Sequence, residues 1–170
     1  MQSDYCGAER DRQMETDVEK LNRLEARLAI EALNCDFCHF LDGNMLDELV
    51  ELFTEDARYS HGLRLSSGRD EIRRLFTGRI KSGVRTSRHM QTGLKITLHN
   101  SAEAEGKSVC LTFACDGPPP VTPATPFLVA DFIDEYQCGA DGRWRIRKRH
   151  IERIFTAEGN SGPVGSGNQQ

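Results

Sequence analysis

Hydrophobic residues in the first half of the chain recur at three- and four-residue steps, which is the period of an α-helix. Asp42-Gly43 ends the longest series, because glycine tolerates the left-handed conformation of a helix C-terminal cap. Asn44 is a suitable cap for the helix that follows. A short strand is expected over residues 57–60. The spacing predicts three helices, over residues 16–41, 45–53 and 70–81.

After Gly83 the apolar residues tend to alternate with polar ones, a pattern typical of β-strands. Residues 139–142 form a hairpin turn signal between two such segments. The proline-rich segment 116–126 cannot continue a strand ladder, because proline lacks the amide donor, and it is long enough to form a lid. The pattern predicts four consecutive strands, over residues 88–99, 107–115, 127–138 and 143–155.

Helices followed by hairpin-linked strands indicate an α+β fold with an antiparallel sheet. We expect a cone-shaped α+β barrel, in which a curved sheet wraps around a long helix with two further helices and leaves an internal cavity. Within the 170 residues, one domain is expected over 16–157. Residues 1–15 lack periodicity and 158–170 are rich in Gly, Ser, Asn and Gln, so both ends are expected to be disordered.

The charge balance argues against nucleic acid as a partner. Lys and Arg total 22 against 26 Asp and Glu, a net charge of −4, which gains nothing from a phosphate field. The one basic cluster lies in the last predicted strand, where alternation allows its charges to face solvent. No apolar run is long enough for a membrane span, and the N-terminal segment lacks the apolar core of a secretory signal, so a cytoplasmic protein is expected.

Six cysteines are present, and Cys35 and Cys38 form a C-x-x-C motif. A zinc site needs a second ligand pair at matching spacing, which this chain lacks. A thioredoxin-like site begins a helix, whereas this motif falls inside one. Buried, inert thiols are the simpler interpretation. Glycine-rich nucleotide-binding loops are also absent, so no metal and no cofactor is expected.

Three polar residues are the main candidates for chemistry. Asp42 follows the first helix, whose negative end disfavours a carboxylate, so a neighbouring cation is expected; alternatively Asp42 only shapes the turn. His89 opens a strand, and histidine is the side chain best matched to proton abstraction at neutral pH if a carboxylate fixes its tautomer. Arg153 could hold a carboxylate, an oxyanion or a leaving group if it faces inward, and is a solvated charge if it faces outward.

Other residues are candidates for substrate binding. Strand alternation puts Asp134 and Tyr136 on one face and Asp131 and Ile133 on the other, without deciding which face borders the cavity. The candidate substrate-binding residues are Phe37, Tyr59, His61, Thr112, Phe132 and Tyr136.

A set of short segments is spread over about residues 21–156: 29–33 (AIEAL), 40–44 (FLDGN), 49–59 (LVELFTEDARY), 68–72 (GRDEI), 88–89 (RH), 134–136 (DEY) and 141–146 (DGRWRI). Together they resemble the SnoaL-like branch of the nuclear transport factor 2-like superfamily, which implies a cystatin-like fold. Within that superfamily, the chain resembles scytalone dehydratase, bile-acid 7α-dehydratase and hexachlorocyclohexane dehydrochlorinase.

This resemblance implies a catalytic Asp–His pair for elimination, which falls on Asp42 and His89, and an arginine in the last strand, which falls on Arg153. The chain departs from the bile-acid enzyme at two positions. Phe37 stands where the bile-acid enzyme has a catalytic tyrosine. The strand aspartate of that enzyme falls near Thr112, where this chain has no acidic residue. The implied chemistry is therefore elimination or proton transfer, with the substrate unspecified.

We expect a cofactor-independent lyase that acts on a small apolar, aromatic, polyketide-like or steroid-like ligand, in a homodimer or homotrimer joined through the outer sheet face. Two alternatives remain open, because this fold hosts many functions. One is a non-catalytic ligand-binding or assembly domain, which predicts a closed pocket or a separated Asp–His pair. The other is the small subunit of a ring-hydroxylating oxygenase, which predicts a hetero-oligomer.

Overall fold

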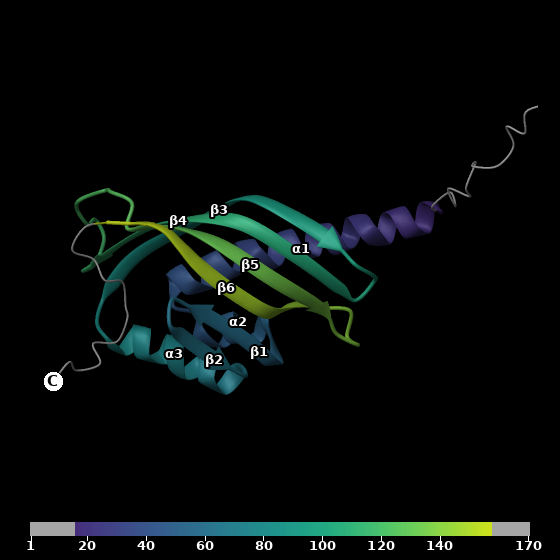
Figure 1. Ribbon diagram of the computed structural model, residues 1–170. Helices are drawn as coiled ribbons and strands as arrows, with labels where there is room; N and C mark the ends of the chain where they lie inside the picture. Colours follow the sequence, from purple (N-terminus) through teal and green to yellow (C-terminus); the bar gives the residue numbers. More distant parts are fainter. Residues whose placement is uncertain (1–15, 158–170) are drawn as a thin grey trace, which may run out of the picture.

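The computed structural model describes residues 16–157, which fold into three helices and six strands (Figure 1). The helices are α1 (Asp17–Gly43), α2 (Leu46–Glu51) and α3 (Arg69–Lys81). The strands are β1 (Phe53–His61), β2 (Arg64–Ser67), β3 (Arg85–Leu98), β4 (Glu103–Asp116), β5 (Leu128–Cys138) and β6 (Trp144–Thr156). The segments 1–15 and 158–170, which were expected to be disordered, lie outside the described residues. The domain boundaries stay a prediction.

The six strands form one curved, unclosed sheet in the order β2-β1-β6-β5-β4-β3, and α1 runs along its inner face (Figure 1). The predicted α+β class is confirmed, with two differences. β1 pairs with β6 in parallel, whereas the other pairings are antiparallel. A parallel neighbour is feasible because the long connection from β1 to β6 contains α3 and four strands. β2, which is not among the strands that the sequence predicted, forms a hairpin with β1.

The boundary between α1 and α2 lies slightly later than the sequence predicted. α1 continues through Gly43, and Asn44 is the left-handed residue, with φ of 54°. Asparagine tolerates this conformation because its short side chain bonds locally. Met45 therefore occupies the N-cap of α2, without a side-chain hydrogen bond. α2 ends at Glu51, since Phe53 already belongs to β1.

The buried apolar side chains of α1 lie toward its C-terminal end. Leu33, Phe37 and Leu41 are buried there, whereas Leu24 and Leu28 in the N-terminal half are 58% and 65% exposed. In Figure 1 the first turns of α1 project beyond the sheet. The C-terminal half of α1 is therefore the part positioned to border an internal cavity.

A buried ion pair joins β5 and β6 to α1. Arg149 is fully buried and donates from Nε and Nη2 to both carboxylate oxygens of Asp134, at 2.8 and 2.7 Å. Nη2 also donates to Oδ1 of Asn34 in α1. The guanidinium carbon lies 4.2 Å from the ring centre of Phe37 and 4.7 Å from that of Phe132. This burial corrects the prediction that the basic cluster of β6 faces solvent.

Further hydrogen bonds complete the network around this ion pair. Tyr136 donates to Asp134 at 2.7 Å and accepts from the amide of Asn34 at 2.9 Å. The amide of Gln91 in β3 donates to Asn34 and to Ser108 in β4. Burial alone would lower the pKa of Arg149, but the Asp134 carboxylate outweighs it and raises that pKa. Arg149 therefore stays charged, and its charge is matched inside the core.

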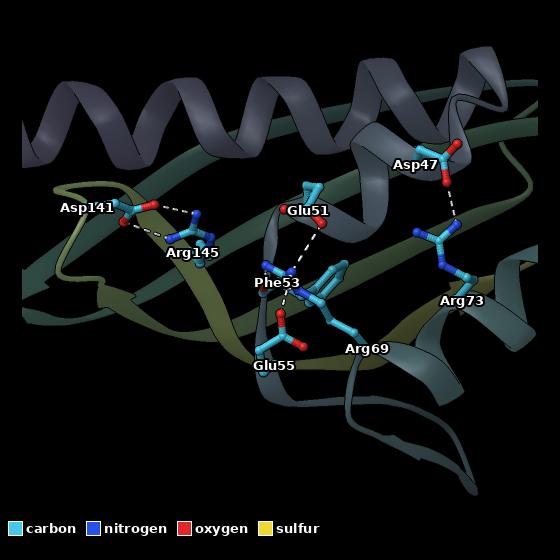
Figure 2. Close-up of polar contacts among 8 residues, drawn as sticks. All are labelled: Asp47, Glu51, Phe53, Glu55, Arg69, Arg73, Asp141 and Arg145. Atoms are coloured by element: carbon cyan, nitrogen blue, oxygen red, sulfur yellow. Dashed lines mark hydrogen bonds and ion pairs between the residues drawn. The ribbon is translucent and has the colours of Figure 1, made fainter.

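Surface ion pairs hold α3 in place (Figure 2). Arg69 in the first turn of α3 donates from Nε and Nη2 to the carbonyl of Phe53, at 2.8 and 2.6 Å, and from Nη1 to Glu55 at 2.7 Å. Arg73 is bonded to Asp47 of α2. These contacts tie α3 to the start of β1 and to α2.

Among residues 16–157, no helix combines the length and apolar character needed to cross a membrane.

The Arg149–Asp134 pair generates a stability prediction. Arg149→Met should lower the free energy of unfolding by about 3–5 kcal/mol, because Asp134 is left buried without its counter-ion. Arg147→Met is the matched control, since Arg147 is 46% exposed in its pair with Glu135 and should cost less than about 1 kcal/mol. Urea unfolding of both variants measures the difference, and equal effects would contradict the proposed importance of the buried pair.

Candidate functional site

A pocket of about 360 Å³ lies between the inner face of the sheet, the C-terminal half of α1, and α3. Its walls are mostly apolar, and the ring of Phe37 contacts those of Phe53 and Phe132 edge-on. Such a chamber is suited to a small ring-containing ligand. The apolar and aromatic side chains that line it are Phe37, Leu41, Tyr59, Leu63, Leu75, Phe76, Ala114, Phe127, Leu128, Phe132 and Ile151.

Asp42 and His89 meet at one wall of this pocket. Nδ1 of His89 lies 2.7 Å from Oδ1 of Asp42, and the backbone N–H of His89 donates to Oδ2 at 2.8 Å. A carboxylate only accepts, so Nδ1 carries the proton and Nε2 is the basic nitrogen. His89 lines the pocket, and Asp42 lies behind it. Two residues 47 positions apart in the chain thus form one polar unit.

Arg79 and Ser87 support the carboxylate of Asp42. The hydroxyl of Ser87 donates to Asp42 at 2.7 Å and accepts from Nη2 of Arg79 at 2.9 Å. Arg79 also donates to the carbonyl of Leu41 in the last turn of α1, at 3.0 Å. Burial raises the pKa of Asp42, but the hydrogen bonds from His89 and Ser87 outweigh it and hold that pKa below its usual value. The cation expected at this helix end is therefore present.

Arg153 faces the pocket and contacts a second histidine. Its Nε donates to Nε2 of His61 at 2.9 Å. Burial, followed by the charges of Arg153, Arg64 and His150, lowers the pKa of His61 to about 4. His61 is therefore neutral at pH 7 and acts as an acceptor that orients the guanidinium of Arg153.

The hydroxyl of Tyr59 is a further polar group at the pocket. Burial raises the pKa of Tyr59 to about 12, so its phenol keeps the proton at neutral pH. Within the described part of the chain, this hydroxyl has no hydrogen-bond partner. It is available as a donor to a ligand.

The structure brings most of the predicted site residues together. Those that line the pocket are His89, Arg153, Phe37, Tyr59, His61, Thr112 and Phe132. Tyr136 does not line it, which corrects its prediction as a substrate-binding residue. Its hydroxyl is bound within the Arg149 network instead, to Asn34 of α1 and to Asp134.

Sequence reasoning missed the arginines other than Arg153. Arg79 was detectable, since it follows Leu75 and Phe76 at the spacing of the apolar stripe of α3, which places it on the buried face. Arg64 had no such signal, because β2 was not recognised as a strand. The proline-rich segment 116–126, which is long enough to form a lid, contributes no residue to the lining of the pocket. Phe127, which directly follows it, does line the pocket.

Metal ligation finds no support in the described residues. Between Thr16 and Ala157, no group of three or more His, Cys, Asp or Glu side chains could hold a metal ion. In the C-x-x-C motif, Cys38 is buried as expected, whereas Cys35 is exposed.

Comparison with known proteins identifies the fold and a family. The SnoaL-like domain family matches residues 22–150 of the chain. No curated protein matches the sequence.

Three solved structures are similar to this chain. A provisionally assigned scytalone dehydratase from Novosphingobium aromaticivorans is 25% identical, with a TM-score of 0.74, and the match covers 88% of this chain and 99% of that one. Hexachlorocyclohexane dehydrochlorinase LinA-type3 from Novosphingobium barchaimii is 20% identical, with a TM-score of 0.69 and coverage of 81% and 92%. A protein of unknown function with a cystatin-like fold from Nostoc punctiforme is 21% identical, with a TM-score of 0.61 and coverage of 82% and 93%.

The lowered pKa of His61 generates a pH prediction. His61 has a pKa of about 4 in the fold, below the ordinary value of 6.5. Between these values the unfolded chain binds more protons, so stability should fall as the pH falls from 6.5 to 4. His61→Gln keeps an acceptor for Arg153 and should flatten this part of the curve. His39→Gln, at an exposed histidine of α1, is the control.

Thermal unfolding of the wild type and both variants at intervals between pH 7 and pH 4 tests this. Parallel curves for the wild type and His61→Gln would show that His61 does not resist protonation in the fold.

Proposed function

This chain belongs to the SnoaL-like domain family, and on that basis we propose that it is a cofactor-independent lyase of the dehydratase type, acting on a small ring-containing substrate. The observation that carries the proposal is the 2.7 Å contact between Nδ1 of His89 and the carboxylate of Asp42 beside an apolar pocket. The dehydratase and dehydrochlorinase names of similar structures support elimination chemistry.

His89 acts as the general base. Its unprotonated Nε2 takes a proton from a carbon of the substrate, and Asp42 stabilises the imidazolium that forms. The electron pair of the C–H bond becomes the new C=C bond, and the leaving group departs with its own bonding pair. If hydroxide leaves, the proton held by His89 neutralises it, so one water is released and the histidine returns to its neutral form.

Tyr59 and Arg153 stabilise the negative charge that develops during elimination. Tyr59 stays protonated and can donate to the departing oxygen, and Arg153 supplies a fixed positive charge in a mostly apolar pocket, where its effect is larger than in water. A positioned base contributes roughly 10²–10⁴-fold to the rate, and substrate orientation in the pocket supplies more.

The geometry argues against the non-catalytic alternative, which predicts a closed pocket or a separated Asp–His pair.

The outer face of the sheet exposes apolar side chains at Val109 and Ile133, each 38% exposed, and at Ile154. We therefore retain the proposal of a homodimer or homotrimer joined through this face. Co-purification with a larger chain would instead favour the oxygenase-subunit alternative.

The proposed base can be tested by substitution. His89→Gln should reduce turnover by about 10²–10⁴-fold, because the general base is removed. Asp42→Asn should lower kcat with little change in KM, because Asp42 acts on the base and not on the substrate, and it should also shift the pH profile of kcat. His39→Gln is the control.

Three reactions provide the readout: dehydration of scytalone, dehydrochlorination of hexachlorocyclohexane, and exchange of the α-protons of 2-tetralone in D₂O, followed by NMR. A correctly folded His89→Gln variant with wild-type rates would refute the role of the base. Failure of the wild type to accelerate any of the three reactions would count against the proposed function.

A further inference from the structure

The polar part of the pocket wall is cationic. Four arginines line the pocket, together with His61 and His89, and none of the lining residues is an Asp or a Glu. The arginines are Arg64, Arg79, Arg85 and Arg153. Arg79, Arg85 and Arg153 are only partly exposed, and a positive charge withdrawn from water is unfavourable unless it has a partner, whereas Arg64 is exposed.

Two of these arginines have such partners within the protein. Arg79 bonds to the carbonyl of Leu41 and, through Ser87, to Asp42. The guanidinium of Arg85 lies 3.6 Å from the carboxylate of Asp116 and stacks over the ring of Phe127. The positive charges of Arg79 and Arg85 therefore already have partners within the protein and are less available to a ligand.

The other two arginines lie at the β1–β2 hairpin and lack a carboxylate partner. Arg64 pairs with His61 in the register of the hairpin, and Arg153 donates its Nε to His61. His61 is neutral, so it fixes the direction of Arg153 without neutralising it. Within the described residues, the Nη atoms of Arg153 and the whole guanidinium of Arg64 have no hydrogen-bond partner. One oriented positive charge, that of Arg153, and the exposed guanidinium of Arg64 thus lie at one end of the pocket.

We propose that the ligand of this pocket is a ring-bearing carboxylate, whose acidic group binds Arg153 and Arg64 at the β1–β2 hairpin while its apolar body fills the chamber beside His89. A guanidinium binds a carboxylate through two parallel N–H donors, and the pair is strong where water is excluded. The aromatic walls accommodate the ring. This inference rests on the proposed function only in taking the ligand to be the substrate of the lyase.

Matched acids and amides test the preference for a charge. The probes are benzoate with benzamide, 2-naphthoate with 2-naphthamide, and 1-pyrenecarboxylate with its amide, which share a shape and differ in charge. Affinities are measured at pH 7.5 by titration calorimetry. At least one acid should bind about 10-fold or more tightly than its amide, as a charge-assisted hydrogen bond predicts. The absence of any such preference in all three pairs overturns the proposal.

Variants then locate the charge. Arg153→Gln and Arg64→Gln should each reduce the preference for the acid at least several-fold while leaving amide affinity nearly unchanged. Arg147→Gln removes the same formal charge from an exposed side chain paired with Glu135, and the preference should persist. Arg64 is itself exposed, so its substitution keeps the test valid even if Arg153→Gln does not fold. An equal loss in Arg147→Gln and Arg64→Gln overturns the site, because it would reflect overall charge only.

These measurements are independent of turnover. A pocket that prefers acids while Asp42→Asn and His89→Gln leave turnover unchanged refutes the lyase proposal alone. A pocket without the preference, in a protein whose activity depends on His89, refutes the carboxylate alone.

Discussion

A guanidinium cannot lie in the apolar interior of a protein without a carboxylate beside it, and Arg149 lies there fully buried against Asp134. Its guanidinium lies against the rings of Phe37 and Phe132, which also line the pocket. The inner wall of the chamber is therefore held by an ion pair that has no direct contact with the ligand space. Asn34 extends the same pair to α1, so the helix and the sheet are fixed relative to each other before any ligand binds.

The pocket separates its negative and positive charges. Asp42 lies behind His89, with its oxygens occupied by donors from His89 and Ser87, so its charge is used to orient an imidazole. Arg153 faces the pocket directly, and its neighbour His61 is neutral. A ligand therefore meets a base at one point and fixed positive charge at another, which is the polarity needed to remove a proton and to stabilise the electrons left behind.

Sequence reasoning located Asp42 and His89 because each stands where a helix or strand pattern is interrupted, and the family resemblance paired them. Arg149 could not be found in this way. It belongs to a run of basic residues that strand alternation assigns to solvent, but the register between β5 and β6 shifts between Glu135 and Tyr136. The shift leaves Arg147 and Lys148 both outside and turns Arg149 inward. Strand alternation alone does not predict such irregularities, and they decide which charge is buried.

Elimination from a carboxylate has a specific electrostatic difficulty that the arrangement around Arg153 addresses. The substrate is already negative, so removing a proton from a neighbouring carbon concentrates a second negative charge in the same small molecule. The apolar walls leave less water there to screen that repulsion than bulk solvent would supply. Arg153, whose guanidinium is oriented by His61, and Arg64, at the β1–β2 hairpin, supply positive charge in place of that screening. The same cations that select an acidic ligand would then also lower the barrier to its deprotonation, so affinity and rate would depend on the same two side chains.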